Sequence, residues 1–344
     1  MKKIYFLINS LNSRSGAERV ACQLANQFSS NGYKIIFYNR DTKKEQVSFS
    51  LSDEVEVVSF DGGLLEMGLA IKKLRKDDIL IIHNMGRLSV FSLFFKPQCK
   101  IVCLEHGPFF AKSFFVRLLT KMFYRNVHQV VTITDKDALN YKNFCKHGSV
   151  KRIYNSSPFN PSDNIYNHSA KKIVAVGRLA KEKNFADLIE AWSLIGRKYS
   201  DWSLEIYGDG DLKDELKSLS LKYNLTNVKI FPNTANIADV YQQAAFLVLT
   251  SKFEGLGMVL IEAQSFGLPL IAYDCPYGPS EIISNNENGI LVENGNVLEL
   301  SSAIEKMIVS SELRKEMSSG AMRSQKKFSL NEILLQWKGI LEDL

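Results

Sequence analysis

Residues 246–263 read FLVLTSKFEGLGMVLIEA, and this stretch decides the fold. Its first four residues are all apolar and predict a buried strand, whereas residues 258–266 predict a helix. The loop between them therefore follows the carboxyl end of a strand, which is where open parallel sheets bind their ligands. The stretch predicts an α/β sheet with a ligand site in this loop.

Two carboxylates, Glu254 and Glu262, stand eight residues apart around this loop. If both were helical, about 100° and 1.5 Å per residue would place them roughly 80° and 12 Å apart, so they cannot converge on one atom. They can bind the two ends of an elongated ligand. The backbone N–H groups of residues 255–258 would then face a negatively charged group in the middle of that ligand. A nucleotide sugar has this shape. The alternative is that Glu254 only interacts with the N-terminal end of the helix dipole and that Glu262 is an ordinary solvated residue.

Length and composition indicate an ordinary soluble protein of two domains, with 344 residues of which 45% are hydrophobic and 23% charged. Its five cysteines are odd in number and match no zinc spacing, which predicts reduced, cytosolic thiols. The first apolar run is too short for a signal peptide. The apolar stretch 79–95 is interrupted by His83, Asn84 and Arg87, so we expect no transmembrane helix.

The net charge of +6 is concentrated in one region. Between Asp78 and Asp135 there are seven Lys/Arg residues and a single acid, Glu105. Within it, residues 109–126 carry Arg117, Lys121 and Arg125 at a spacing of four, with aromatic residues and leucines on the other side of the predicted helix. This pattern is typical of a basic amphipathic helix on an anionic membrane surface. The alternative is a helix that packs its Phe/Leu face on the core and leaves a basic face in water. No nucleic-acid module is recognisable.

Strand-like and helical segments alternate along the chain, which predicts parallel sheets covered by helices. A turn-rich stretch at 155–164 marks the interdomain linker. We therefore expect domains at 1–160 and 161–327, with a final segment, 328–344, that crosses back to the first. Strands are expected at 4–8, 34–38, 55–59, 79–83, 101–105 and 130–134, and then at 173–176, 204–207, 228–231, 246–249 and 270–273.

Three further loops between a strand and a helix carry candidate residues. Arg178 and Lys183 flank one such loop and could neutralise a diphosphate leaving group. Gly16 lies in the equivalent loop of the first half, where glycine lets backbone approach a ligand. His106 follows a strand and would lie at a sheet edge. The alternatives are a solvated basic loop for the first and a structural histidine for the last.

Several short motifs follow one another in a fixed order along nearly the whole chain. They are SGAER at 15–19, EHG at 105–107, GRL at 177–179 with Lys183, YGDG at 207–210, EGLG at 254–257 with Glu262, and GLPLI at 267–271. In this order they resemble the retaining GT-B glycosyltransferases of family 4, of the bacterial surface-polysaccharide type. Any one of the motifs alone would be weak, but the ordered set is specific.

The resemblance implies two Rossmann-like domains facing across a cleft, the GT-B fold, with the acceptor held mainly by the first domain and the sugar donor by the second. It implies that Glu262 holds the ribose and that Arg178 and Lys183 hold the diphosphate. It assigns His106 and Glu254 to the transferred sugar as catalytic residues. The remaining donor contacts would come from Gly16, Gly255, Leu256, Gly257 and Met258.

The chain departs from the family pattern in places that carry no charge. Phe231-Pro-Asn233 stands where a glycine is usual, Asn155-Ser156 replaces an Asn-Gly, and Leu256 replaces the commoner Phe. Two Asp-x-Asp patterns, at 135–137 and 209–211, imitate a metal-binding motif but have no supporting ligands nearby, so we expect no catalytic metal and no cofactor. The resemblance implies that the anomeric configuration is retained, by attack on the face that the diphosphate leaves. The DCPYGPSE loop at 274–281 is similar to that of members that use UDP-sugars.

The sequence therefore predicts a metal-independent, retaining transferase (EC 2.4) that moves a hexose or N-acetylhexosamine from a nucleotide sugar, UDP-linked by resemblance, to a glycan or polyprenyl-diphosphate-linked acceptor. We expect a cytoplasmic protein that can contact the inner face of the plasma membrane through Arg117, Lys121 and Arg125. Two alternatives are a nucleotide-sugar 2-epimerase on the same architecture and a non-catalytic nucleotide-sugar-binding protein.

Overall fold

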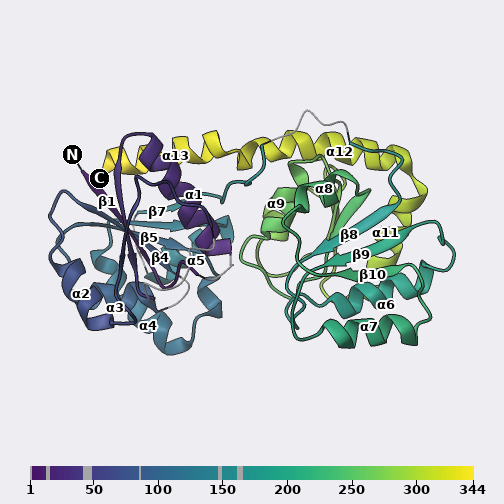
Figure 1. Ribbon diagram of the computed structural model, residues 1–344, viewed down its shortest axis with the longest axis horizontal. Helices are drawn as coiled ribbons and strands as arrows, with labels where there is room; N and C mark the ends of the chain where they lie inside the picture. Colours follow the sequence, from purple (N-terminus) through teal and green to yellow (C-terminus); the bar gives the residue numbers. More distant parts are fainter. Residues whose placement is uncertain (1, 13–15, 42–48, 85–86, 146–148, 161–165) are drawn as a thin grey trace. The chain divides into compact units, whose positions relative to one another are not determined.

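The computed structural model describes residues 2–12, 16–41, 49–84, 87–145, 149–160 and 166–344. The chain divides into two compact units: unit 1 comprises residues 1–156 and 330–344, and unit 2 comprises residues 157–329. Each unit is built around one parallel sheet with intervening helices (Figure 1). Parallel strands require crossover connections, and the alternating pattern of the sequence supplies a helix for most of them.

Unit 1 holds a sheet with the order β3-β2-β1-β4-β5-β6-β7, in which all pairs are parallel. The order turns around at β1, whose neighbours are β2 and β4. The central strands are buried on both faces, as parallel strands between helix layers must be. The strands are β1 Lys3–Ile8, β2 Lys34–Asn39, β3 Glu56–Ser59, β4 Ile79–Asn84, β5 Lys100–Glu105, β6 Gln129–Thr132 and β7 Val150–Arg152.

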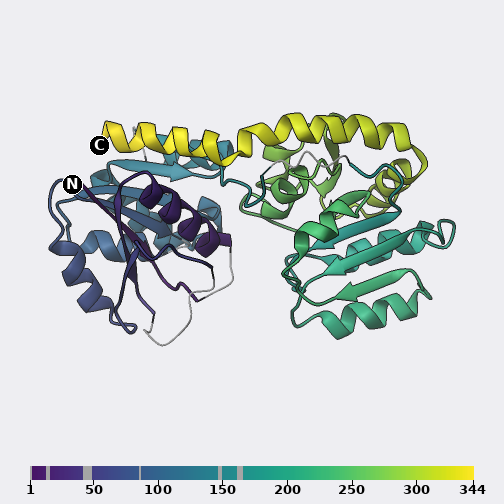
Figure 2. The ribbon, with the colours of Figure 1, turned by 45° about the horizontal axis from the view of Figure 1, so that its top comes forward.

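The helices of unit 1 include one from the far end of the chain. They are α1 Gly16–Ser30, α2 Leu64–Lys72, α3 Leu88–Phe94, α4 Phe114–Phe123, α5 Asp135–Cys145 and α13 Leu330–Asp343. Figures 1 and 2 show α13, in yellow, running along this unit beside α1. Its fully buried Trp337 meets the ring of Phe28 edge-on at 6.0 Å. The last helix therefore completes the core of unit 1.

Unit 2 repeats the arrangement with the order β10-β9-β8-β11-β12-β13. Its core gathers fully buried side chains such as Trp192 of α6 and Phe246 of β11. The strands are β8 Lys172–Val176, β9 Ser203–Tyr207, β10 Val228–Phe231, β11 Phe246–Leu249, β12 Leu270–Tyr273 and β13 Gly289–Val292. The helices are α6 Phe185–Ile195, α7 Lys213–Lys222, α8 Ile237–Gln242, α9 Met258–Gln264, α10 Pro279–Ile282, α11 Val297–Val309 and α12 Ser311–Gln325.

The predicted α/β class and the two Rossmann-like sheets are confirmed. All eleven expected strands form, and three of them (β10, β11 and β12) have the predicted bounds. The strands β7 and β13, the last of each sheet, were not predicted from the sequence. Both are short, and β7 contains only one apolar residue, so periodicity gives them little signal.

The predicted continuous helix over 109–126 is wrong. A single turn at Phe109–Ala111 precedes α4, and a second turn at Tyr124–Asn126 follows it. Lys112 is extended, and Ser113 caps α4 by accepting a hydrogen bond from the Val116 N–H. In the part of the chain that the structure describes, no helix has the length and apolar character needed to cross a membrane.

Candidate active site

The loops after β8 and β11 carry most of the candidate residues in unit 2. The strand order reverses between these two neighbouring strands, because the chain builds β9 and β10 on one side and β11 to β13 on the other. Their carboxyl ends therefore form a switch point, where open α/β sheets bind ligands. Arg178 and Lys183 lie in the first loop and Glu254 lies in the second.

Lys183 and Glu254, 71 positions apart in sequence, form an ion pair at this edge, with Lys183 Nζ 2.6 Å from Glu254 Oε1. The Ser251 hydroxyl donates to the same oxygen at 2.6 Å. The side chains of Lys183 and Glu254 are only 21% and 11% exposed. Two short charge-assisted contacts on one oxygen fix the orientation of the carboxylate. Its other oxygen, Oε2, makes no hydrogen bond to any described residue and can accept one from a ligand hydroxyl.

Two hydrogen bonds to backbone carbonyls join the same two loops. The Thr250 hydroxyl donates to the Lys183 carbonyl at 3.0 Å, and the Lys252 N–H donates to the Glu182 carbonyl at 2.8 Å. Thr250 and Ser251 are almost fully buried. The two loops that carry the ion pair are therefore linked to each other by hydrogen bonds and do not move independently.

Two glycines shape the loop before α9. Gly257 has a φ of +90°, which is strained for any residue with a side chain. Gly278 has a φ of +89°, and a Cβ there would lie 2.5 Å from the Leu256 carbonyl oxygen. The segment 274–278 therefore lies directly against the Glu254–Gly257 loop. Within it, burial and the nearby Glu254 carboxylate raise the pKa of the Cys275 thiol to about 12, so this thiol stays protonated at neutral pH and is a poor nucleophile.

Glu262 is not the solvated surface residue of the alternative interpretation. It lies in α9 with 4% of its surface exposed, and the Tyr241 hydroxyl donates to its Oε2 at 3.0 Å. Tyr241 itself is fully buried in α8. A carboxylate buried at this depth is held in a defined position, which suits a contact with a ligand hydroxyl.

Arg178 lies at the exposed side of the same edge. Its side chain is 73% exposed and pairs with Glu182, four residues on. The Glu182 backbone N–H, more than the Arg178 guanidinium, lowers the pKa of the Glu182 carboxyl. A surface ion pair of this kind contributes little to the stability of the protein. Arg178 can therefore leave Glu182 and bind a ligand at a small cost in free energy.

The candidates of unit 1 lie after β1 and β5. Gly16 is exposed and is the first residue of α1; residues 13–15, which precede it, lie outside the described residues. His106 directly follows β5 and is 7% exposed. Its Nε2 lies 3.1 Å from Nδ1 of His83, a residue near the end of the neighbouring strand β4.

A buried polar network holds the segment after His106. Glu105 is fully buried and accepts from Lys112 Nζ at 2.9 Å and from the Tyr124 hydroxyl. Lys112 also donates to the Tyr141 hydroxyl at 2.6 Å. Burial above all raises the pKa values of Tyr124 and Tyr141 well above the ordinary tyrosine value, so both stay protonated donors. Glu105, the only acid between Asp78 and Asp135, is therefore engaged by other buried side chains.

The Asp-x-Asp patterns at 135–137 and 209–211 have structural partners. Asp137 accepts from the Phe109 N–H at 2.8 Å, and Asp209 accepts from the Asn233 N–H at 2.9 Å. Asp209 also pairs with Lys213 at 3.3 Å. Among the described residues, no group of three or more His, Cys, Asp or Glu side chains could hold a metal ion.

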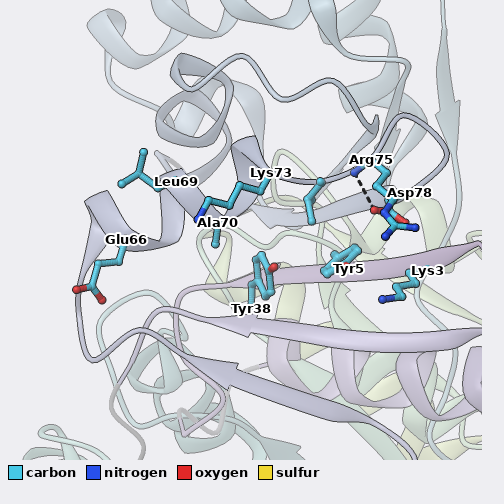
Figure 3. A pocket seen from close by; sticks show the side chains of 10 residues that line it. Lys3, Tyr5, Tyr38, Glu66, Leu69, Ala70, Lys73, Arg75 and Asp78 are labelled. Carbon is cyan, nitrogen blue, oxygen red and sulfur yellow. Dashed lines mark hydrogen bonds between the residues drawn. The ribbon is translucent and has the colours of Figure 1, made fainter.

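A hollow of about 420 Å³ lies elsewhere in unit 1 (Figure 3). Its lining includes Lys3 and Asp78, at the amino ends of β1 and β4. Figure 3 shows the hydrogen bond from the Arg75 N–H to the Asp78 carboxylate. None of the predicted site residues lines it. The candidate residues at the carboxyl ends of the strands are therefore separate from this hollow.

Five supporting residues were not singled out as site residues from sequence: Thr250, Ser251, Tyr241, His83 and Lys112. A signal existed for the first two, because polar residues that end a buried strand face the ligand edge. His83 also ends an apolar run. Nothing in the sequence pattern marks Tyr241 or Lys112. The partner of Tyr241 is 21 positions away, and the nearest partner of Lys112 is 7 positions away.

Comparison with known proteins gives consistent results. Residues 157–324 match the family model "Glycosyl transferases group 1". The amylovoran biosynthesis glycosyltransferase AmsD of Erwinia amylovora is 29% identical, over 99% of this chain and 100% of its own. An α-1,4-N-acetyl-D-galactosaminyltransferase of Campylobacter jejuni, named for an undecaprenyl-diphosphate-linked GalNAc glycan, is 25% identical over 100% and 99%.

A crystal structure of Staphylococcus aureus TarM in complex with fondaparinux, α-GlcNAc-glycerol and UDP has the same fold. It superposes with a TM-score of 0.86 at 16% identity, over 99% of this chain and 100% of that one. With the two Rossmann-like sheets, these comparisons show that the chain is a GT-B glycosyltransferase, a transferase of the EC 2.4 class. Neither the epimerase nor the non-catalytic alternative is favoured.

Proposed function

We propose that this GT-B glycosyltransferase moves a hexose or N-acetylhexosamine from a UDP-sugar to a lipid-linked glycan, with retention of configuration and without a metal, in bacterial surface-polysaccharide synthesis. The observation that carries the proposal is the Lys183–Glu254–Ser251 cluster at the switch point of unit 2. It places a positive charge and an oriented carboxylate side by side, which suits a ligand with a diphosphate next to a sugar. The relatives from Erwinia amylovora and Campylobacter jejuni support the class of product.

In this proposal the donor lies along the edge formed by the loops after β8 and β11. Glu262 binds the ribose, Lys183 and Arg178 neutralise the diphosphate, and Glu254 accepts a hydrogen bond from a hydroxyl of the transferred sugar through Oε2. The backbone N–H groups of Gly255, Leu256, Gly257 and Met258 add donors beside Glu254. Gly16 and His106, at the corresponding edge of unit 1, contact the diphosphate and the sugar.

The reaction requires no protein nucleophile. An acceptor hydroxyl oxygen bonds to the anomeric carbon on the face from which the UDP oxygen departs, and the hydroxyl proton passes to that diphosphate oxygen. Lys183 and Arg178 stabilise the negative charge that develops on the leaving group. The protonated thiol of Cys275, next to Glu254, supports this assignment because it offers no competing nucleophile.

We further propose that unit 1 contacts an anionic membrane through α4. The exposure of α4 supports this proposal: Phe114, Phe115, Leu118 and Met122 face solvent, whereas Val116 and Thr120 face the core. The exposed fractions are 75% for Phe114, 66% for Phe115, 50% for Leu118 and 55% for Met122, and Phe110 in the preceding turn is 53% exposed. The interpretation in which this helix packs its Phe/Leu face on the core is therefore wrong.

Basic side chains flank this apolar face. The Arg117 guanidinium lies over the Phe110 ring at 5.3 Å, and Lys121 Nζ lies over the Phe144 ring at 5.3 Å. Arg125 is exposed, and the single acid of the region, Glu105, is buried. Exposed aromatic residues beside cations complement an anionic lipid surface, where a polyprenyl-linked acceptor would also be found.

The donor assignment is tested by thermal unfolding with a panel of nucleoside diphosphates and nucleotide sugars in EDTA. A ligand at about 100 times its dissociation constant adds about 2.7 kcal/mol of stability. We expect stabilisation by UDP and one UDP-sugar, and its loss in Lys183→Met. A folded sample that responds to no nucleotide would contradict the proposal. NMR of the product formed on a lipid-linked acceptor then reports the anomeric configuration, and inversion would refute retention.

A further inference from the structure

Two histidine rings lie edge to edge, nearly in one plane, where β4 and β5 end. Nδ1 of His83 and Nε2 of His106 are 3.1 Å apart, and the rings are nearly parallel at 20° with centroids 5.2 Å apart. On its other side, His83 stacks on Phe6 of β1 at 5.0 Å and 24°. His83 is therefore held by strands on both sides, and its ring cannot turn without losing the contact with Phe6 and the hydrogen bond to His106.

Both rings are neutral near pH 7. Burial, with a smaller contribution from His106, lowers the pKa of His83 well below its usual value. Burial likewise lowers the pKa of His106 to about 4, against an opposing effect of the Glu105 carboxylate. Two neutral imidazoles that share one hydrogen bond have a single proton between the facing nitrogens, so the tautomer of one ring dictates that of the other.

The remaining nitrogen of His83 indicates which ring donates. His83 Nε2 is buried and has no hydrogen-bond partner among the residues that the structure describes. A buried N–H without an acceptor is rarer in proteins than an unsatisfied acceptor. The favoured tautomer of His83 therefore carries its proton on Nδ1, which donates to His106 Nε2. The Nε2 of His83 is then unprotonated. His106 must then carry its own proton on Nδ1.

We propose that His83 is a positioning residue that holds His106 as its Nδ1–H tautomer, so that His106 presents a hydrogen-bond donor to an oxygen of the transferred sugar. This rests on the role of His106 in the proposed function. His106 forms no other side-chain hydrogen bond within the described part of the chain, so Nδ1 is the ring nitrogen that remains for a ligand. In the opposite tautomer, Nδ1 would repel an oxygen that it should bind.

Two substitutions at His83 separate the hydrogen bond from the packing. His83→Phe keeps an aromatic ring between Phe6 and His106 but cannot donate. His83→Asn can place an amide N–H near the position of Nδ1. We expect His83→Phe to lower kcat roughly tenfold, the value of one hydrogen bond of about 1.4 kcal/mol, with KM for the donor unchanged. His83→Asn should restore most of the lost rate.

Nitrogen-15 NMR of the imidazoles gives a readout that does not depend on activity. We expect the wild-type spectrum to show His106 protonated on Nδ1 only, and His83→Phe to show a mixture of both tautomers. An Nε2–H tautomer in wild-type protein, or an unchanged tautomer and kcat in a folded His83→Phe variant, would overturn the inference. If His106→Ala leaves kcat unchanged, the proposed role of His106 fails instead, and the NMR result still decides whether His83 sets its tautomer.

Discussion

At the scale of single residues, the two glutamates that the sequence places eight positions apart occupy different surroundings. Glu254 lies in a loop and is oriented by Lys183 and Ser251, with one carboxylate oxygen left for a ligand. Glu262 is buried in α9 and bonded to Tyr241. The first is suited to a mobile sugar hydroxyl, and the second to a fixed contact such as the ribose.

Replacing Glu262 by alanine should therefore weaken nucleotide binding and leave the sugar contact intact. We expect Glu262→Ala to cost about 1.5 to 3 kcal/mol in UDP affinity, the value of a charge-assisted hydrogen bond, measured by calorimetry. Tyr241→Phe is the matched control, because it removes the partner hydroxyl and keeps the charge, and should cost less. Unchanged UDP affinity in a folded Glu262→Ala variant would remove the ribose assignment.

The neutral histidine pair predicts a loss of stability in mild acid. The pKa of His106 is about 4 in the folded protein and about 6.5 when unfolded, so the unfolded chain binds more protons in between and stability falls as the pH falls from 6.5 toward 4. Between pH 7 and pH 5 the effect of His106 is about 2 kcal/mol. Urea unfolding at both pH values should show wild-type protein losing this much more than His106→Phe. An equal loss in both proteins would contradict the assignment.

At the scale of elements, α4 differs most from its sequence pattern. Spacing alone could not tell which face of a helix meets the core, since an aromatic face can be buried or exposed. The structure buries Val116 and Thr120 and leaves Phe114, Phe115 and Leu118 in solvent. Such a contiguous exposed apolar face beside basic side chains is uncommon unless it is an interaction site.

Two sets of variants test the membrane proposal for α4. Phe114 and Phe115 changed together to Ser should lower binding to anionic liposomes at any salt concentration, because the inserted apolar area is lost. Arg117, Lys121 and Arg125 changed together to Gln should abolish the salt-sensitive part of the binding, measured by cosedimentation. Leu221, 75% exposed on α7 of unit 2, provides a control as Leu221→Ser. Wild-type protein that ignores anionic liposomes would exclude this role.

At the scale of the whole molecule, the two sheets share one strand order, except that β7 extends the sheet of unit 1. The loops of Lys183 and Glu254 lie at the reversal of strand order in unit 2, whereas in unit 1 Gly16 follows β1 at the reversal and His106 follows β5, one strand beyond it. The last helix returns to unit 1, where Ile333, Trp337 and Ile340 are each about 1% exposed. The core of unit 1 therefore depends on residues from both ends of the chain.

Trp337→Ala should destabilise unit 1 selectively. Loss of a fully buried tryptophan costs about 3–5 kcal/mol. Hydrogen exchange followed by mass spectrometry should show faster exchange in β1, β2 and α1, with exchange in α6 and α11 of unit 2 unchanged. Trp202→Ala, in the core of unit 2, is the reciprocal control and should affect unit 2 alone. Equal acceleration in both units with Trp337→Ala would contradict the assignment of α13 to unit 1.

The sequence by itself determined the α/β class, the two sheets and the strands that are buried between helices, because apolar runs of four to six residues separated by amphipathic helices leave few other solutions. It also determined which loops hold Arg178, Lys183 and Glu254. Strand order decided that these loops are neighbours, and strand order is a long-range property that local patterns do not encode.

Only the tertiary structure decided the surroundings of these side chains. The ion pair of Lys183 with Glu254, the burial of Glu262 against Tyr241, and the hydrogen bond between His83 and His106 join residues 71, 21 and 23 positions apart. It likewise decided that α4 turns its aromatic face outward. Hydrophobic periodicity reports whether an element has two faces, but the neighbour that covers each face is set by packing across the whole unit.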